Sequence, residues 1–279
     1  MMGLRIKGIP DRQMEVDEMT EAIRVKKEGG IVEITLNRPE AFNAFDLDMV
    51  ELLSKSLIHL AADDSVSAVV ISGEGKAFCA GGDLKWALNF PGGAPAAFHE
   101  LAARYHQAIL EIRRMRKPVI AAVNGIAAGG GFSLALACDF RIVAQSAVLR
   151  QAYTSSGLCI DGGGTFTLPR LVGLGRAMEI VAFDKAISSE QALAWGLATK
   201  VVEDGRLLEE AREMARELAR SSLHSFGWCK QLLTDSFNTA FEGQIERERI
   251  GLSFCAAHPD GQEGLRGFAE KRRPIFNVK

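Results

Sequence analysis

Residues 117–137 read KPVIAAVNGIAAGGGFSLALA, and this stretch decides the fold. Residues 118–123 form a short apolar run that is typical of a strand buried on both faces. Gly129, Gly130 and Gly131 follow, and the small residues up to Ala137 predict a tightly packed helix. A glycine turn between a strand and a helix points the unpaired N–H groups of the helix start toward negative charge. The stretch therefore predicts an α/β unit with a turn suited to an anion.

The same order of strand and helix recurs on both sides of this stretch. Apolar and polar residues alternate over 22–27 and 31–36, and the glycines between them predict a β-hairpin. The other expected elements are a helix over 46–62 capped by Asp46, a strand over 68–72, a helix ending before Pro118, a strand over about 139–144 and a helix opening near Gly162. Such alternation is typical of an α/β core in which helices cover the sheets.

Strand patterns stop after Glu203, and the rest of the chain has helical spacing of apolar residues. We therefore expect a polar leader at 1–20, a core with the ligand site at 21–203 and a helical region at 204–279. No low-complexity linker separates these parts. The helical region is expected to pack on the core or on a neighbouring subunit.

The composition limits the class of protein. A chain of 279 residues with a formal net charge of -2 has no basic patch for nucleic acid or for an anionic membrane surface. The five cysteines form no CxxC pair, which argues against a disulfide framework and against a metal site. With no apolar signal segment and no run long enough to span a bilayer, the expected location is the cytoplasm.

Three glycine-rich turns each follow an expected strand and precede an expected helix: FCAGGDL at 78–84, NGIAAGGG at 124–131 and GLCIDGGGT at 157–165. Glycine lets the backbone approach a ligand because no Cβ intervenes. None of the turns carries the Lys-Ser/Thr pair of a P-loop, and no GxGxxG opens the first strand–helix–strand unit. Tight packing would explain one such turn, but the ordered set of three indicates a binding site.

The motifs, taken in order, resemble those of the crotonase (enoyl-CoA hydratase/isomerase) family. The resemblance is carried by LNRP at 36–39 with FNA at 42–44, AFCAGGDL at 77–84, KPVIAAVNG at 117–125 running into 129–131, CD at 138–139 and FAEKRRPIF at 268–276. It covers essentially everything after the leader. It implies a spiral of ββα turns followed by a helical trimerisation region, so a homotrimer or homohexamer is expected.

The resemblance also implies a site for a coenzyme A thioester as substrate, with no prosthetic group. The N–H groups of Gly82 and Gly130 match the family's oxyanion hole, in which each preorganised donor is worth about 3 kcal/mol. Further contacts to coenzyme A are expected, by the same resemblance, from Arg38, Phe42, Ala44, Ala80, Gly81, Gly82, Asp83, Leu84, Gly129, Gly130 and, from a neighbouring subunit, Lys271.

Two positions direct the choice of reaction. Hydratases of the family use two glutamates where this chain has Ser133 and Tyr153, and neither side chain is an effective base on its own. Asp161 lies where the family's double-bond isomerases place their Glu or Asp. The expected activity is therefore acyl-CoA isomerisation, with Asp161 moving a proton along the acyl chain. Residues 161–177 look most like enzymes that isomerise the ring-epoxide thioester of phenylacetate breakdown, with Tyr153 as an acid.

Several alternatives remain open. Asp161 could cap the helix that begins at the following glycines, or it could be a nucleophile as in the family's aryl-CoA dehalogenases. The chain could also be a hydratase or hydrolase on the same scaffold, or a silent paralogue that binds acyl-CoA or a partner protein. The five histidines, His106 among them, have no partner in a recognisable motif and are interpreted as structural or solvated.

Overall fold

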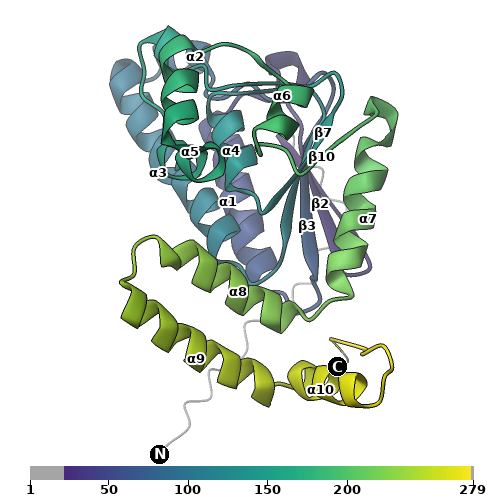
Figure 1. The fold of residues 1–279 in the computed structure, drawn as a ribbon. Helices are drawn as coiled ribbons and strands as arrows, with labels where there is room; N and C mark the ends of the chain where they lie inside the picture. The colour runs from purple at the N-terminus through teal and green to yellow at the C-terminus, as the bar shows by residue number, and fades with distance from the viewer. Residues whose placement is uncertain (1–21, 278–279) are drawn as a thin grey trace, which may run out of the picture.

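The fold is built on two sheets, as a computed structural model that describes residues 22–277 shows (Figure 1). The larger sheet has six strands in the order β1-β2-β3-β5-β7-β10, and the smaller has four in the order β4-β6-β8-β9. The strands of the larger sheet are β1 Ile23–Glu28, β2 Ile31–Leu36, β3 Ala68–Gly73, β5 Val119–Val123, β7 Phe140–Ala144 and β10 Lys200–Val202. Those of the smaller sheet are β4 Ala77–Cys79, β6 Ile126–Ala128, β8 Val148–Arg150 and β9 Ile187–Ser188.

Helices connect many of the strands and continue after the last one. They are α1 Leu47–Ala62, α2 Leu84–Leu88, α3 Gly93–Arg114, α4 Gly130–Ala137, α5 Gly164–Phe183, α6 Ser189–Ala194, α7 Leu207–Ala219, α8 Leu223–Ser236, α9 Phe241–Ala257 and α10 Pro259–Ala269. Helix α7 packs against β3, β5 and β7, while α1 and α3 pack on each other (Figure 1). The α/β class predicted from the sequence is confirmed. The expected leader at 1–20 lies outside the described residues.

Most expected elements lie where the sequence placed them. The hairpin pairs β1 with β2 antiparallel, and Gly29 at its turn has a φ of 59°. Asp46 caps α1, because its carboxylate accepts a hydrogen bond from the Met49 N–H at 3.0 Å. Helix α4 spans the predicted residues and is buried throughout, so its small side chains allow close packing.

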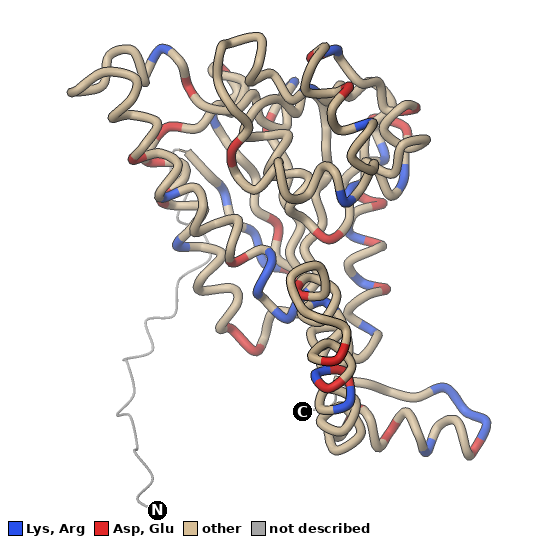
Figure 2. The backbone as a smooth tube through the Cα atoms, turned by 60° about the vertical axis from the view of Figure 1, so that its left-hand side comes forward, with Lys and Arg blue, Asp and Glu red and all other residues tan. Residues whose placement is uncertain are grey.

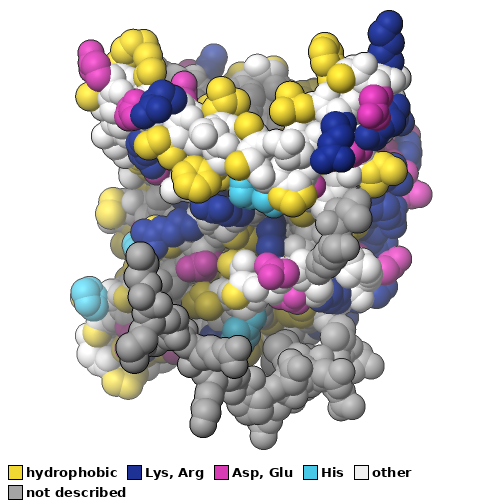
Figure 3. Space-filling view, turned by 90° about the horizontal axis from the view of Figure 1, so that it is seen from below, with side chains coloured by type: hydrophobic (Ala, Val, Ile, Leu, Met, Phe, Trp, Pro, Cys, Tyr) yellow, Lys and Arg dark blue, Asp and Glu magenta, His cyan; other side chains and the backbone are white. Residues whose placement is uncertain are grey.

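Helices α8, α9 and α10 form a C-terminal arm that extends below the body of the molecule (Figures 1 and 2). Lys230 of α8 fixes the arm to the core, since its ammonium donates to the carbonyl oxygens of Ile112 at 2.6 Å and Lys117 at 3.2 Å and to Asp139 Oδ2 at 2.7 Å. The view from below shows hydrophobic side chains at the surface beside lysines and arginines (Figure 3). The side chain of Phe268, near the end of α10, is 87 % exposed. None of the described helices has the length and apolar character needed to cross a membrane.

Candidate active site

Two of the glycine turns meet at the floor of a cavity. They follow β4 and β6, which are parallel neighbours in the smaller sheet. A Cβ added to Gly81, whose φ is +95°, would lie 3.0 Å from the Gly130 nitrogen. A Cβ added to Gly131 would lie 2.0 Å from the Cys79 carbonyl oxygen, so only glycine fits there. We call Gly81, Gly82, Gly129 and Gly130 the glycine floor.

The glycine floor presents two donors to the cavity. Gly82 and Gly130 both line it, and within residues 22–277 neither N–H donates a hydrogen bond to another protein group. Gly130 is the first residue of α4, so its N–H has no acceptor in the preceding turn and lies at the positive end of the helix. Gly82 and Gly130, which the sequence resemblance placed in one oxyanion hole, thus line the same cavity, and their role there stays a prediction.

Two aromatic residues, Phe45 and Tyr105, hold the two turns together. The Phe45 N–H donates to the Gly81 carbonyl at 2.7 Å, and the Phe45 carbonyl accepts from the Asp83 N–H at 2.9 Å. The Tyr105 hydroxyl donates to the Gly130 carbonyl at 2.6 Å, and its ring centre lies 4.9 Å from that of Phe45. Burial, and then the nearby Tyr153 and Asp161, raise the pKa of Tyr105, so its hydroxyl remains a donor.

The cavity has a volume of about 330 Å³. Its lining is mainly apolar and includes Phe45, Pro95, Phe98, Leu101, Tyr105 and Leu158. Pro95 and Phe98 come from the start of α3, which follows the short connection after α2. The cavity therefore combines a small number of polar groups with apolar walls, as small-molecule sites generally do.

One wall of the cavity carries two polar side chains, Tyr153 and Asp161, which we call the polar wall. The Tyr153 hydroxyl donates to Asp161 Oδ1, and it lies 3.5 Å from the Ser133 hydroxyl. Burial, followed by the charge of Asp161, raises the pKa of Tyr153 far above its usual range. Tyr153 is thus a neutral donor, and Asp161 is the only carboxylate among the cavity-lining residues.

Asp161 does not cap helix α5. The cap position belongs to Gly163, which has no capping side chain, and the helix begins at Gly164 rather than near Gly162. The Asp161 carboxylate faces Tyr153 instead, and its side chain remains 36 % exposed. The capping alternative was wrong because two consecutive glycines with positive φ, Gly162 and Gly163, separate Asp161 from the helix.

The structure adds His106 to the site, which the sequence interpretation treated as structural or solvated. His106 Nε2 accepts the Gly162 N–H at 3.2 Å and lies 3.8 Å from Asp161 Oδ2. His106 directly follows Tyr105 on α3, and Tyr105 lines the cavity. This adjacency is the only feature of the sequence that could have pointed to His106. In the described part of the chain, no cluster of three or more His, Cys, Asp or Glu side chains is arranged to hold a metal ion.

Several of the residues expected at the coenzyme are joined by hydrogen bonds and ion pairs. The Arg38 guanidinium contacts the Ala44 carbonyl at 2.6 Å, Asp46 at 3.0 Å and Asp83 at 3.2 Å. The Ala80 N–H donates to the Phe42 carbonyl at 3.0 Å. Arg38 is therefore bound by two carboxylates, and it braces this segment rather than presenting a free cation.

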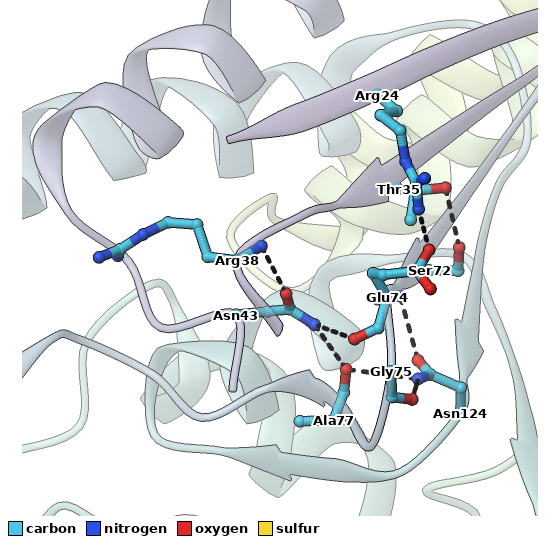
Figure 4. A network of polar contacts seen from close by, with 10 residues as sticks. Arg24, Thr35, Arg38, Asn43, Ser72, Glu74, Gly75, Ala77 and Asn124 are labelled. Carbon is cyan, nitrogen blue, oxygen red and sulfur yellow. Dashed lines mark hydrogen bonds and ion pairs between the residues drawn. The ribbon is translucent and has the colours of Figure 1, made fainter. Parts of the chain in front are cut away.

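Buried Asn43 fixes the same segment (Figure 4). Its amide oxygen accepts the Arg38 N–H at 2.8 Å, and its amide nitrogen donates to the carbonyls of Glu74 at 2.9 Å and Ala77 at 2.7 Å. These bonds hold Asn43 at a φ of 56°, in the left-handed region. The side chains of Phe42 and Leu84 are about half exposed.

Lys271, unlike the other expected site residues, lies just after the last helix of the C-terminal arm. This helix, α10, lies at the opposite end of the molecule from α2 and α4 (Figure 1). The backbone N–H of Lys271 donates a hydrogen bond to the carbonyl oxygen of Phe268, at the end of α10, at 3.2 Å. Within one chain Lys271 is separated from the glycine floor.

Comparisons with known proteins agree on the kind of protein. The family model described as "Enoyl-CoA hydratase/isomerase" matches residues 26–279. The chain is 36% identical over 262 residues to 1,2-epoxyphenylacetyl-CoA isomerase from Escherichia coli (strain K12), covering 94% of this chain and 100% of that protein. It is 32% identical to 4-chlorobenzoyl coenzyme A dehalogenase-2 from Arthrobacter sp, covering 89% and 91%. The crystal structure of a putative enoyl-CoA hydratase from Streptomyces coelicolor A3(2) superposes with a TM-score of 0.88 at 30% identity, covering 99% and 100%. These matches confirm the fold and the family predicted by the sequence resemblance.

Proposed function

The chain belongs to the enoyl-CoA hydratase/isomerase family, and within it we propose an acyl-CoA isomerase. The observation that carries the proposal is the polar wall: one carboxylate, Asp161, bonded to one neutral donor, Tyr153, in the cavity that Gly82 and Gly130 line. Isomerisation needs a single base that takes and returns a proton. Hydration by two glutamates has no counterpart here, since Ser133 and Tyr153 occupy those positions.

In this mechanism the substrate thioester places its carbonyl oxygen on the N–H groups of Gly82 and Gly130. Asp161 removes a proton from one carbon of the acyl chain, and the negative charge moves to the carbonyl oxygen. The two N–H groups stabilise this enolate because they are already oriented and pay no ordering cost. Asp161 then returns the proton to a different carbon. Where the substrate carries an oxygen leaving group, the Tyr153 hydroxyl instead gives its proton to that oxygen and takes up the proton that Asp161 removed, so both groups return to their starting state.

The same proposal covers where coenzyme A binds and how the chains assemble. Coenzyme A runs along the segment from Phe42 to Ala44 and the turn from Ala80 to Leu84, which Arg38 braces. Residues 21–203 hold the site in this assignment, and residues 204–279 build a homotrimer or homohexamer. The exposed apolar side chains of the C-terminal arm support such an assembly, in which a neighbour's arm would bring Lys271 to the coenzyme. We place the protein in the cytoplasm.

An aryl group is the acyl class that the cavity favours. Aromatic rings of Phe45, Phe98 and Tyr105 line it, and aromatic rings pack well on one another. One relative is named 1,2-epoxyphenylacetyl-CoA isomerase, and a phenylacetyl group would match this aromatic lining. An aryl-acetyl thioester with a ring oxygen would use Tyr153 as the acid. Straight-chain 3-enoyl thioesters are the simpler substrate to compare with it.

His106 supports a second candidate, hydration or hydrolysis with a water activated by the imidazole. Its Nε2 lies 3.8 Å from Asp161 Oδ2, but this nitrogen accepts the Gly162 N–H and makes no hydrogen bond to the carboxylate. Moreover, His106 lines a separate hollow between α3, α5 and α8, and it is not among the residues that line the cavity with Gly82 and Gly130. Isomerisation therefore remains the favoured function.

One experiment separates these candidates. The protein is incubated in deuterated water with the coenzyme A thioesters of a 3-enoyl, a 2-enoyl and an aryl-acetic acid, and the products are analysed by mass spectrometry and NMR. We expect a moved double bond or deuterium at the α or γ carbon, without added water, and loss of both in Asp161→Asn. A hydroxyacyl product that persists in Asp161→Asn would support hydration instead. Binding of all three thioesters with no turnover would support a silent paralogue.

A further inference from the structure

The backbone just before Tyr153 is strained. Ala152 has a φ of 53°, in the left-handed region that residues with a Cβ rarely adopt. It lies between β8 and the turn that carries Tyr153. Such a conformation persists only where its surroundings impose it. Whatever holds Ala152 therefore also sets where the Tyr153 hydroxyl points.

Asp184 is the group that holds Ala152. Its Oδ1 accepts the Ala152 N–H at 2.8 Å, and its Oδ2 accepts from Arg150 Nη2 at 3.1 Å. The Arg150 Nε also donates to the Asp184 backbone carbonyl, at 2.9 Å. The Asp184 side chain is only 6 % exposed. Burial alone would raise the pKa of Asp184, but hydrogen bonds from Ser155, the Ala152 N–H and Arg150 outweigh it and lower the pKa, so the carboxylate stays charged.

Gln151 holds the backbone that follows Ala152. Its side chain is fully buried, and its Oε1 accepts the Tyr153 N–H at 3.0 Å and the Thr154 N–H at 3.4 Å. The backbone on both sides of Ala152 is thus tied to a buried acceptor. Of the two acceptors, only Asp184 comes from a distant part of the chain, 32 residues after Ala152.

Helix α5 links Asp184 to Asp161. The helix begins at Gly164, whose N–H donates to the Asp161 carbonyl at 3.0 Å, and it ends at Asp184, whose N–H donates to the Ile180 carbonyl. Asp161 and the support of Tyr153 are therefore attached to opposite ends of one segment of the chain. This segment bends at Gly173, whose φ of 76° and ψ of 157° are not helical, so two helical parts join the members of the polar wall.

We propose that Asp184 is a positioning residue for the reaction, which holds Ala152 in its left-handed conformation and so aims the Tyr153 hydroxyl at Asp161. The proposal rests on the function proposed above, since it acts through Tyr153. Asp184 is not among the residues that line the cavity and does not contact the substrate. It also ends α5, so a purely structural role is the alternative to exclude.

The test is a double-mutant cycle on kcat and KM. Its substrate is an aryl-acetyl thioester of coenzyme A that carries a ring oxygen, because this substrate uses Tyr153 as the acid. Tyr153→Phe is expected to lower kcat by about 100-fold, the lower range of acid–base effects. Asp184→Ala should lower kcat by about tenfold with KM nearly unchanged, because the substrate contacts stay intact while the donor is misaligned. In the Tyr153→Phe background, Asp184→Ala should have no further effect on kcat.

Two more variants separate positioning from stability. Asp184→Asn keeps an oxygen that can accept the Ala152 N–H, so it should restore most of kcat. Ala152→Gly combined with Asp184→Ala should restore part of it, since glycine adopts positive φ without strain. Thermal unfolding is measured for every variant. If Asp184→Ala and the variant that combines it with Ala152→Gly have the same lowered melting temperature but different kcat, then the restored kcat does not come from restored stability.

The outcomes are distinct. Equal tenfold losses of kcat from Asp184→Ala with Tyr153 present and absent would overturn the positioning role. A fall in kcat for Tyr153→Phe together with wild-type kcat for Asp184→Ala would overturn it as well, while leaving the proposed function intact. Absence of isomerase activity in the wild-type protein would overturn the proposed function itself.

Discussion

The glycine floor acts through backbone groups, whereas the polar wall acts through side chains. The floor is fixed by close contacts that exclude a Cβ, such as the 3.0 Å between a Cβ at Gly81 and the Gly130 nitrogen. The wall is fixed by hydrogen bonds from segments far apart in the chain, at Tyr153, Asp161 and Asp184. Backbone donors stabilise negative charge on a thioester carbonyl oxygen whichever reaction produces it. In the proposed mechanism the side chains decide where the proton goes, so the polar wall determines the reaction.

The largest expected effect comes from removing the base in the polar wall. Asp161→Asn keeps the size of the side chain and an acceptor for Tyr153, but the amide cannot take a proton, so kcat should fall by about 1,000-fold. Steady-state kinetics measure it. Asp64→Asn, at an exposed position, is the matched control and should retain wild-type kcat. A loss in both variants, or in neither, would contradict the role of Asp161.

A smaller effect is expected from a methyl group on the glycine floor. Gly81→Ala places a Cβ against the Gly130 nitrogen and forces a φ of +95° on a residue that has a Cβ. Displacing one donor of such a site lowers kcat by about 100-fold. Gly175→Ala is the control, because a Cβ there meets nothing within 4 Å. Similar kcat values for the two variants would show that the floor is not the donor site.

The smallest effect concerns pH. Both tyrosines of the chain, Tyr105 and Tyr153, have pKa values raised by burial, so neither should ionise in the folded protein at pH values where free tyrosine does, about 10. Tyrosinate absorbance near 295 nm should be absent from the native protein at about pH 10.5 and should appear on unfolding in denaturant. Because the unfolded chain releases these protons first, the stability that the neutral tyrosines contribute is complete below about pH 10 and declines above it.

Tyrosinate that forms in the native protein at the pH of free tyrosine would contradict the burial of the polar wall. The measurement also sharpens the comparison, since Tyr105 supports the floor and Tyr153 belongs to the wall. Tyr153→Phe leaves one tyrosine, and its titration then reports on the floor alone.

The sequence predicted the floor better than the wall for a physical reason. Buried strands such as Val119–Val123 and the glycine turns leave local patterns, because burial and the absence of Cβ restrict the residue types at each position. The four strands of the smaller sheet were not predicted as strands. They have only two or three residues each, too few to show a period.

The supports of the polar wall leave no local pattern. His106 reaches Gly162 from 56 residues away, and Asp184 reaches Ala152 from 32 residues away. Each is an ordinary helix residue or helix end in the sequence, and only the packing of α3 and α5 brings it to the site. Asp161 was assigned to the site by the family resemblance. That it does not cap α5 follows from the positive φ angles of Gly162 and Gly163, which the sequence alone does not determine.

The division between floor and wall is tested most directly by the infrared carbonyl band of a bound saturated acyl-CoA labelled with ¹³C at the thioester carbon. Hydrogen bonds from Gly82 and Gly130 weaken the C=O bond, so the band should move to lower wavenumber on binding to the wild-type protein. We predict the same shift in Asp161→Asn, which has an intact floor, and a loss of most of it in Gly81→Ala. A shift that disappears in Asp161→Asn, or that persists in full in Gly81→Ala, would contradict the account.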